Sequence, residues 1–101
     1  MDSMHGEVAG IEIGDCPSGT VLAVATQNSS YRLIVRNPLT GNSLIEGGRF
    51  FAEPIPGRVE GSIDAGGVFH AGRIQVGERL HLFGGEQPIT TSRVSSIVVE
   101  P

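Results

Sequence analysis

The chain has 101 residues, a hydrophobic fraction of 39% and a formal net charge of -4 at pH 7. This length fits one domain with one modest core, and no apolar run approaches the roughly 20 residues that a membrane-spanning helix needs. The acidic balance argues against general attraction to nucleic acid or to anionic membranes.

The N-terminal segment carries neither a basic start nor an apolar core, so it does not resemble a signal peptide. We expect residues 1–7 to be flexible and residues 8–101 to form a single all-β domain. Met1 and Met4 both remain possible starts. The single cysteine, Cys16, precludes an internal disulfide and fits a reducing compartment, so we expect a cytoplasmic protein.

Short apolar runs alternate with turn-forming residues along the chain. Residues 20–26 are apolar on both faces, as in a strand inside a sheet, and residues 30–36 are predicted to return as the second arm of a hairpin. Further short strands are expected at residues 8–13, 43–46, 49–53 and 58–64, and residues 68–70 are too few to assign. Pro54 and Pro56 predict a break in regular pairing, with an edge or a crossover there.

The clearest pattern lies near the C-terminus. Leu80 and Leu82 alternate with Arg79, His81 and Phe83, which is typical of a strand with one buried face. The apolar run within residues 90–99 predicts its partner, with the turn around Gly84-Gly85. Together these patterns predict an all-β fold, a small, mainly antiparallel barrel or two-sheet sandwich of about seven to eight short strands.

Residues 72–80, Gly-Arg-Ile-Gln-Val-Gly-Glu-Arg-Leu, resemble the G-x-I-x-x-G-D/E-x-L turn in the second β-barrel domain of translation GTPases. Residues 57–61 are similar to the strand that precedes this turn in those domains. The resemblance implies a small closed barrel. It implies no GTPase activity, because the chain has no phosphate-binding loop.

Catalytic and metal-binding motifs are absent from the sequence. His70, His81 and Cys16 lack the spacing of a zinc site, so we expect no metal and no cofactor. Ser62, His70 and Asp64 contain the residue types of a nucleophilic triad, but alternation places Ser62 and Asp64 on the outward face of a strand. The carboxylate of Asp15 beside Cys16 should discourage thiolate formation. We therefore expect no catalytic residues.

Two sets of residues suggest binding instead. Arg32 and Arg36 lie on one face of the 30–36 strand and could bind a phosphate or carboxylate, unless acidic residues on neighbouring strands pair with them. Phe51 and Phe83, with His81, could form an exposed aromatic surface for a partner, unless both sides of the sheet are buried there.

The sequence thus favours a non-catalytic module that binds another protein or assembles with itself. A small barrel that binds an anion or single-stranded nucleic acid through Arg32 and Arg36 is the alternative, although nucleic acid is the less favoured ligand. An enzyme without a recognisable motif ranks third, and no membrane partner is expected.

Overall fold

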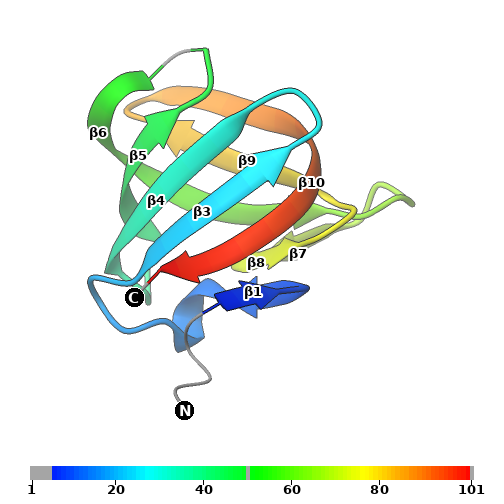
Figure 1. Cartoon of the computed structure of the whole chain (residues 1–101), viewed down its shortest axis with the longest axis horizontal. Coiled ribbons are helices and arrows are strands. Elements are labelled where there is room, and N and C mark those ends of the chain that lie inside the picture. The colour runs from blue at the N-terminus through cyan, green and yellow to red at the C-terminus, as the bar shows by residue number, and fades with distance from the viewer. Residues whose placement is uncertain (1–5, 50, 101) are drawn as a thin grey trace.

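The computed structural model describes residues 6–49 and 51–100. Six of the strands formed by these residues pair one with the next around a closed ring (Figure 1). The ring runs through β3 (Val21–Thr26), β4 (Ser30–Asn37), β5 (Asn42–Gly47), β6 (Phe51–Ile63), β9 (Arg79–Gly84) and β10 (Gln87–Glu100), and β10 pairs with β3 again. Every pair in the ring is antiparallel, so the predicted all-β fold is confirmed and takes the form of a closed barrel.

Short elements flank this ring. β1 (Gly6–Val8) extends the sheet beside β10, and β7 (Phe69–Ala71) pairs with the end of β6. β2 (Gly10–Glu12) and β8 (Arg73–Gln75) form a separate pair, and a 3-10 turn over Ile13–Asp15 follows β2. Within the described ranges, no helix has the length and apolarity that crossing a bilayer requires.

Gly6 and Glu7 correct the expected boundary of the N-terminal segment. Both residues pair with β10, opposite Val99 and Val98, so the ordered chain begins before residue 8. The single strand predicted at residues 8–13 is divided between β1, β2 and the 3-10 turn. The other residues of the predicted flexible segment, including Met1 and Met4, lie outside the described residues.

Alternation along the strands fills the barrel interior. The odd-numbered residues of β4 from Tyr31 to Val35 are buried, whereas Arg32 and Arg36 are exposed, as predicted. In β9, Leu80 and Leu82 are buried. The interior aliphatic side chains of the ring include Leu22, Val24, Leu33, Val35, Ile45, Val59, Leu80, Leu82, Ile89, Val94, Ile97 and Val99. Burial of these apolar groups is the main favourable contribution to folding.

β6 is one continuous strand rather than the two strands predicted. Its first half carries the exposed Pro54 and Pro56 and has only β5 as a described strand partner, because pairing with β9 begins at Gly57. The strand continues through the prolines, so the prediction of two separate strands was wrong. The predicted break in regular pairing is present, because the β5–β6 register shifts between the Gly47–Phe51 and Ile45–Ile55 pairs. The prolines lie on an edge, where the absent N–H groups break no ladder.

A β-bulge at Glu60 and Gly61 changes which face of β6 points inward. Val59 lies opposite Leu82, but Gly61 already lies opposite His81, so β6 contains one residue more than β9 at this point. Gly61 accommodates the bulge with a φ of 154°. As a result Ser62 is fully buried, which corrects the outward position predicted for it.

Candidate functional site

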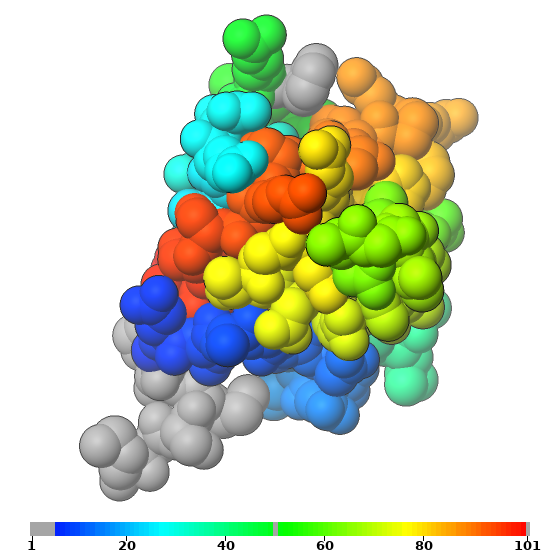
Figure 2. Space-filling view, turned by 90° about the vertical axis from the view of Figure 1, so that its right-hand side faces the viewer, coloured from blue at the N-terminus to red at the C-terminus, as the bar shows by residue number. Residues whose placement is uncertain are grey.

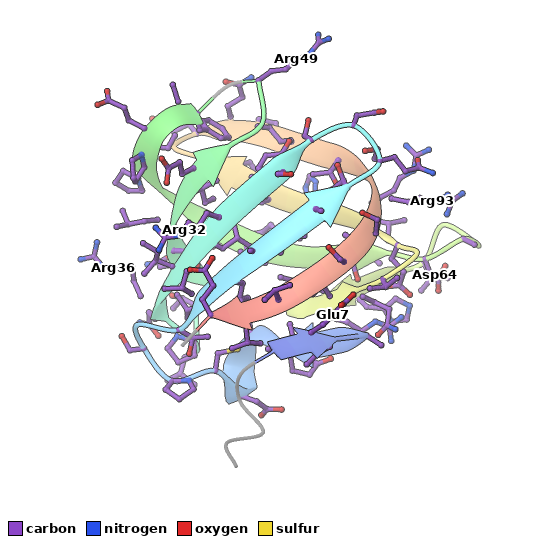
Figure 3. The ribbon with its side chains drawn as sticks, in the orientation of Figure 1. Glu7, Arg32, Arg36, Arg49, Asp64 and Arg93 are labelled. Carbon is purple, nitrogen blue, oxygen red and sulfur yellow. The ribbon has the colours of Figure 1, made fainter. Side chains whose placement is uncertain are left out.

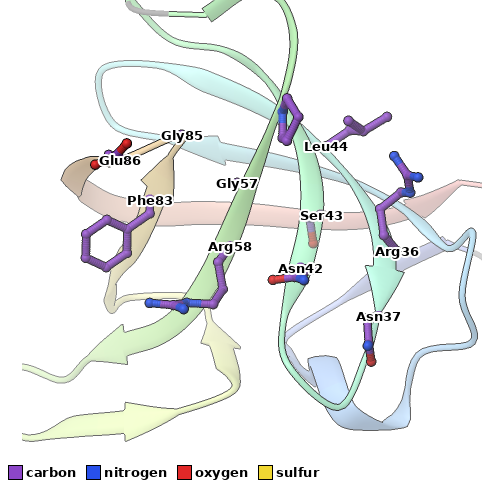
Figure 4. A pocket seen from close by; sticks show the side chains of 11 residues that line it. Arg36, Asn37, Asn42, Ser43, Leu44, Gly57, Arg58, Phe83, Gly85 and Glu86 are labelled. Atoms are coloured by element: carbon purple, nitrogen blue, oxygen red, sulfur yellow. The ribbon is translucent and has the colours of Figure 1, made fainter.

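An open groove of about 860 Å³ crosses the outside of the barrel over β4, β5, β6 and β9 (Figure 4). We call it the outer groove. Its lining residues are Arg36, Asn37, Asn42, Ser43, Leu44, Pro56, Gly57, Arg58, Phe83, Gly85 and Glu86. Two guanidinium groups, two side-chain amides and an aromatic ring therefore meet on one face, where they can donate hydrogen bonds and offer apolar contact.

The strand register aligns four of these side chains in a row. Asn37 of β4 lies opposite Asn42 of β5, Asn42 lies opposite Arg58 of β6, and Arg58 lies opposite Phe83 of β9. Cross-strand partners share one face of a sheet, so all four side chains are on the outside of the barrel. The row runs from two amides through a guanidinium to an aromatic ring. It exists because the closed ring brings together strands that are distant in the sequence.

Arg58 and Phe83 are in direct contact within the groove. The Arg58 guanidinium lies 5.3 Å from the centroid of the Phe83 ring, within the range of a cation–π interaction. Its Nε also donates to the Glu60 carboxylate. These two contacts hold the Arg58 side chain across the ring, and its terminal nitrogens have no other described partner.

The structure separates the two arginines that the sequence grouped. Figure 3 shows Arg32 and Arg36 on the same side of the barrel, but only Arg36 lines the outer groove. Arg32 forms an ion pair with Glu100 at 3.4 Å, the cross-strand pairing that the sequence analysis gave as the alternative to anion binding. Arg36 has no ion pair among the described residues, so its charge is available to a ligand.

Phe83 and His81 continue into an aromatic row with Phe69. The His81 ring packs edge-on against Phe83, with centroids 5.8 Å apart, and against Phe69 at 6.4 Å. Phe69 is 46% exposed. Strand alternation in the sequence groups Phe83 with His81 but gives no signal for Phe69, because β7 is too short to show a pattern.

Phe51 does not belong to this surface. It is 5% exposed and packs in the barrel interior, which corrects its placement as a candidate interaction residue. A Cβ atom at Gly84 would overlap the Phe51 ring, so the glycine provides the space for it. Phe50, the other half of the Phe-Phe pair, lies outside the described residues.

A second group of polar side chains lies at the β6–β7 hairpin, and we call it the polar cluster: Ser62, Asp64, His70, Arg73 and Glu78. His70 Nε2 lies 2.8 Å from Asp64 Oδ2. Ser62 Oγ donates to Glu78 Oε1 at 2.6 Å, and Arg73 binds both oxygens of the same carboxylate. Figure 2 shows the hairpin, in lime, beside the yellow β8–β9 segment that carries Arg73 and Glu78.

Hydrogen bonding keeps both carboxylates of the polar cluster ionised. The His70 ring, followed by the backbone N–H groups of Val68 and Gly66, lowers the pKa of Asp64. The Arg73 guanidinium, and to a smaller extent the Ser62 hydroxyl, lowers the pKa of Glu78 despite partial desolvation. Arg73 responds in the opposite direction, because its contact with Glu78 raises its pKa.

The polar cluster brings Ser62, His70 and Asp64 together but not as a nucleophilic triad. The Ser62 hydroxyl is buried and donates to Glu78, and no described hydrogen bond joins it to His70. A nucleophile needs a base within hydrogen-bond reach of its own proton. The arrangement is therefore suited to holding charge rather than to attacking a substrate.

Neither Cys16 nor His81 joins His70 in a group of possible metal ligands among the described residues. Cys16 is buried beside the 3-10 turn, where its Sγ lies 3.5 Å from the Glu12 carbonyl oxygen. Burial raises the pKa of the thiol, and the Asp15 carboxylate raises it further. The thiolate form of Cys16 is therefore disfavoured, as predicted. His81 Nδ1 lies 2.9 Å from the Thr90 hydroxyl. His70 instead approaches Asp64 and Glu78, and Glu78 was missed because no sequence spacing links it to His70.

No protein-family model, curated protein or solved structure matches this chain.

Proposed function

We propose that this protein is a non-catalytic binding module whose outer groove takes an extended, acidic segment of a partner protein. The observation that carries the proposal is the contrast between the groove and the rest of the molecule. The chain has a net charge of -4, yet the described lining of the groove contains two arginines, Arg36 and Arg58, and one acidic residue, Glu86. Arg58 also forms an ion pair with Glu60 through its Nε, so the unpaired charge of the groove is that of Arg36, and Arg58 adds its terminal nitrogens. Opposite charge on the partner would favour both encounter and register.

The chemistry of the lining specifies the kind of segment. Arg36 and the free nitrogens of Arg58 offer charge-assisted hydrogen bonds to carboxylates. Asn42 can pair with the main chain of an extended peptide, because an amide offers both donors and an acceptor. Asn37 can contribute its N–H donors, because its Oδ1 already accepts the Leu39 N–H at 3.0 Å. Phe83, Leu44 and Pro56 give the apolar contact that an aliphatic or aromatic side chain of the partner would cover.

The test is a peptide array of matched acidic, neutral and basic sequences, each with one apolar residue, followed by fluorescence polarisation on the strongest binders. Arg36→Ala and Arg58→Ala should each weaken binding of acidic peptides by about tenfold or more, as expected for loss of a hydrogen bond to a charged group. Phe83→Ser should weaken binding without unfolding the barrel, because Phe83 lies on the outside.

Arg32→Ala is the matched control. It removes the same charge from the same face of β4 but lies outside the groove, where Arg32 pairs with Glu100. An equal loss of binding in Arg32→Ala and Arg36→Ala would mean that net charge alone drives association, and would refute a specific groove. A second copy of the chain as occupant would instead appear as a concentration-dependent mass in light scattering that Phe83→Ser abolishes.

Single-stranded nucleic acid is the second candidate ligand. The Arg58–Phe83 pair favours it, because an aromatic ring beside a cation is the usual platform for a stacked base. The acidic net charge, and the presence of one aromatic ring among the described lining residues, make it the weaker candidate. Oligonucleotide binding that falls steeply with salt and depends on Arg36 and Phe83 would replace the peptide proposal with this one.

A further inference from the structure

The polar cluster combines a nitrogen ligand with two carboxylates on three separate segments. Ligand atoms of Asp64, His70 and Glu78 all lie within 4.8 Å of one another. Asp64 follows β6, His70 lies in β7, and Glu78 lies in the turn between β8 and β9. Ligands of one zinc ion lie about 2.0–2.2 Å from the metal, so small side-chain rotations bring these atoms into range.

Two of these three side chains are already oriented by their neighbours. Asp64 Oδ1 accepts the backbone N–H groups of Gly66 and Val68 at 2.9 and 3.0 Å, which leaves Oδ2 directed toward His70. Glu78 is positioned by the buried Ser62 hydroxyl. Metal ligands in proteins are commonly held by such hydrogen bonds, which fix their orientation.

Arg73 occupies the place of a cation in this arrangement. Its guanidinium neutralises Glu78 from one side, at 3.2 Å between Nε and Oε1 and through a second bond to Oε2. Arg73 has another acidic residue available, because Glu12 of β2 lies directly opposite it in the β2–β8 pair. The guanidinium can therefore move from Glu78 to Glu12 without losing an acidic neighbour.

We infer that Asp64, His70 and Glu78 form a binding site for a divalent transition-metal ion such as zinc, which displaces Arg73 from Glu78. One imidazole and two carboxylates suit zinc and similar ions, whereas calcium and magnesium prefer oxygen ligands alone. The bound ion would join the β6–β7 hairpin to the β8–β9 turn. It would thereby fix Phe69, the neighbour of His70 at the end of the aromatic row.

The first experiment titrates zinc into the chelator-treated protein by calorimetry and follows the melting temperature. Saturable binding with one ion per chain, together with a higher Tm, is the expected result, because an ion that binds only the folded state stabilises it. The His70 ring-nitrogen resonances should shift in NMR spectra of the unaltered protein. No heat and no Tm change with zinc in excess, or His70 signals that do not move, would overturn the inference.

Variants then locate the site. His70→Ala should weaken zinc binding at least about tenfold, since loss of even a hydrogen-bond partner of a ligand costs roughly 10–100-fold. His81→Ala, which removes another partly exposed imidazole, is the control and should bind as before. If His70→Ala fails to fold, Asp64→Asn replaces it, because an amide oxygen can still accept the turn N–H groups. Equal affinity in the His70 or Asp64 variant and in His81→Ala would refute the site.

Arg73→Gln tests the exchange of the guanidinium for metal. Without its competitor, Glu78 should bind zinc more tightly, and the affinity should rise several-fold in a protein that circular dichroism shows to be folded. An unchanged or lower affinity would show that Arg73 does not compete with the ion.

Discussion

Phe51 and Phe83 have opposite environments although both are phenylalanines on strands of the barrel. Phe51 fills interior space above Gly84, whereas Phe83 lies outside beneath Arg58. Sequence alternation placed Phe83 correctly, because its strand has one uniformly apolar face. It misplaced Phe51, since two adjacent phenylalanines leave open which ring points inward, and the space offered by Gly84 comes from another strand.

This difference predicts unequal costs of truncation. Phe51→Ala should lower the free energy of unfolding by about 3–5 kcal/mol, the usual cost of removing a buried phenylalanine side chain. Phe83→Ala should cost much less, because its ring is partly in solvent before truncation. Urea unfolding monitored by circular dichroism measures both values. Similar losses in the two variants would place Phe83 in the core as well.

Ser62 and Glu78 are a second case in which the sequence pattern does not predict where a side chain lies. The bulge at Gly61 inverts the face of every later residue in β6, so a pattern that predicts Arg58 and Val59 correctly fails at Ser62. A single inserted residue has this effect because side chains alternate with a period of two. The contact between Ser62 and Glu78 could therefore not be derived from spacing.

Among the elements, β6 has two halves with different hydrogen bonding. The second half pairs with β9 on one side and with β5 or the turn before β5 on the other. On the side of that turn, the Val59 N–H donates to the Gly41 carbonyl oxygen at 2.9 Å. The first half has an irregular register with β5 between Gly47 and Ile45. The first half is therefore expected to open more readily than the second.

Amide hydrogen exchange should show this gradient along one strand. The exposed Ala52 and Glu53 are expected to exchange fast, and Val59 and Ser62 slowly, because exchange from a doubly paired strand requires larger openings. Native-state exchange followed by NMR provides the measurement. Uniform protection from Ala52 to Ser62 would mean that β6 opens as one unit and would contradict the gradient.

At the scale of the whole molecule, the positions of the strands could be predicted better than the way in which the strands close into a barrel. The local patterns identified the hairpin of residues 20–26 and 30–36 and the final strand pair, which appear as β3–β4 and β9–β10. The pairing of β10 with β3 joins Glu100 to Val21. Nothing local encodes a contact of such separation, so barrel and sandwich were both compatible with the sequence.

Closure makes the C-terminal strand essential. Deletion of residues 94–101 removes the β10–β3 pairs and the buried Val94, Ile97 and Val99. Loss of these three buried aliphatic groups at about 2–5 kcal/mol each is comparable with the whole stability of about 5–15 kcal/mol typical of a domain, and the β10–β3 hydrogen bonds are lost as well. The shortened chain should therefore be unfolded by circular dichroism and NMR.

Deletion of residues 1–8 is the comparison. β1 lies outside the ring and pairs only with β10 among the described strands, so its loss should leave a folded barrel with a lower Tm. A folded protein without residues 94–101, or an unfolded one without residues 1–8, would contradict the central role of ring closure.

The prolines of β6 also affect how this molecule behaves beside copies of itself. β6 pairs with β9 only from Gly57 onward. Before Gly57, the main chain of β6 presents a side to which a strand from another molecule could add. Pro54 and Pro56 lie in this stretch and have no N–H to donate to an incoming strand. This opening of the ring is consequently a poor template for intermolecular sheet growth, and the barrel is protected there against polymerisation.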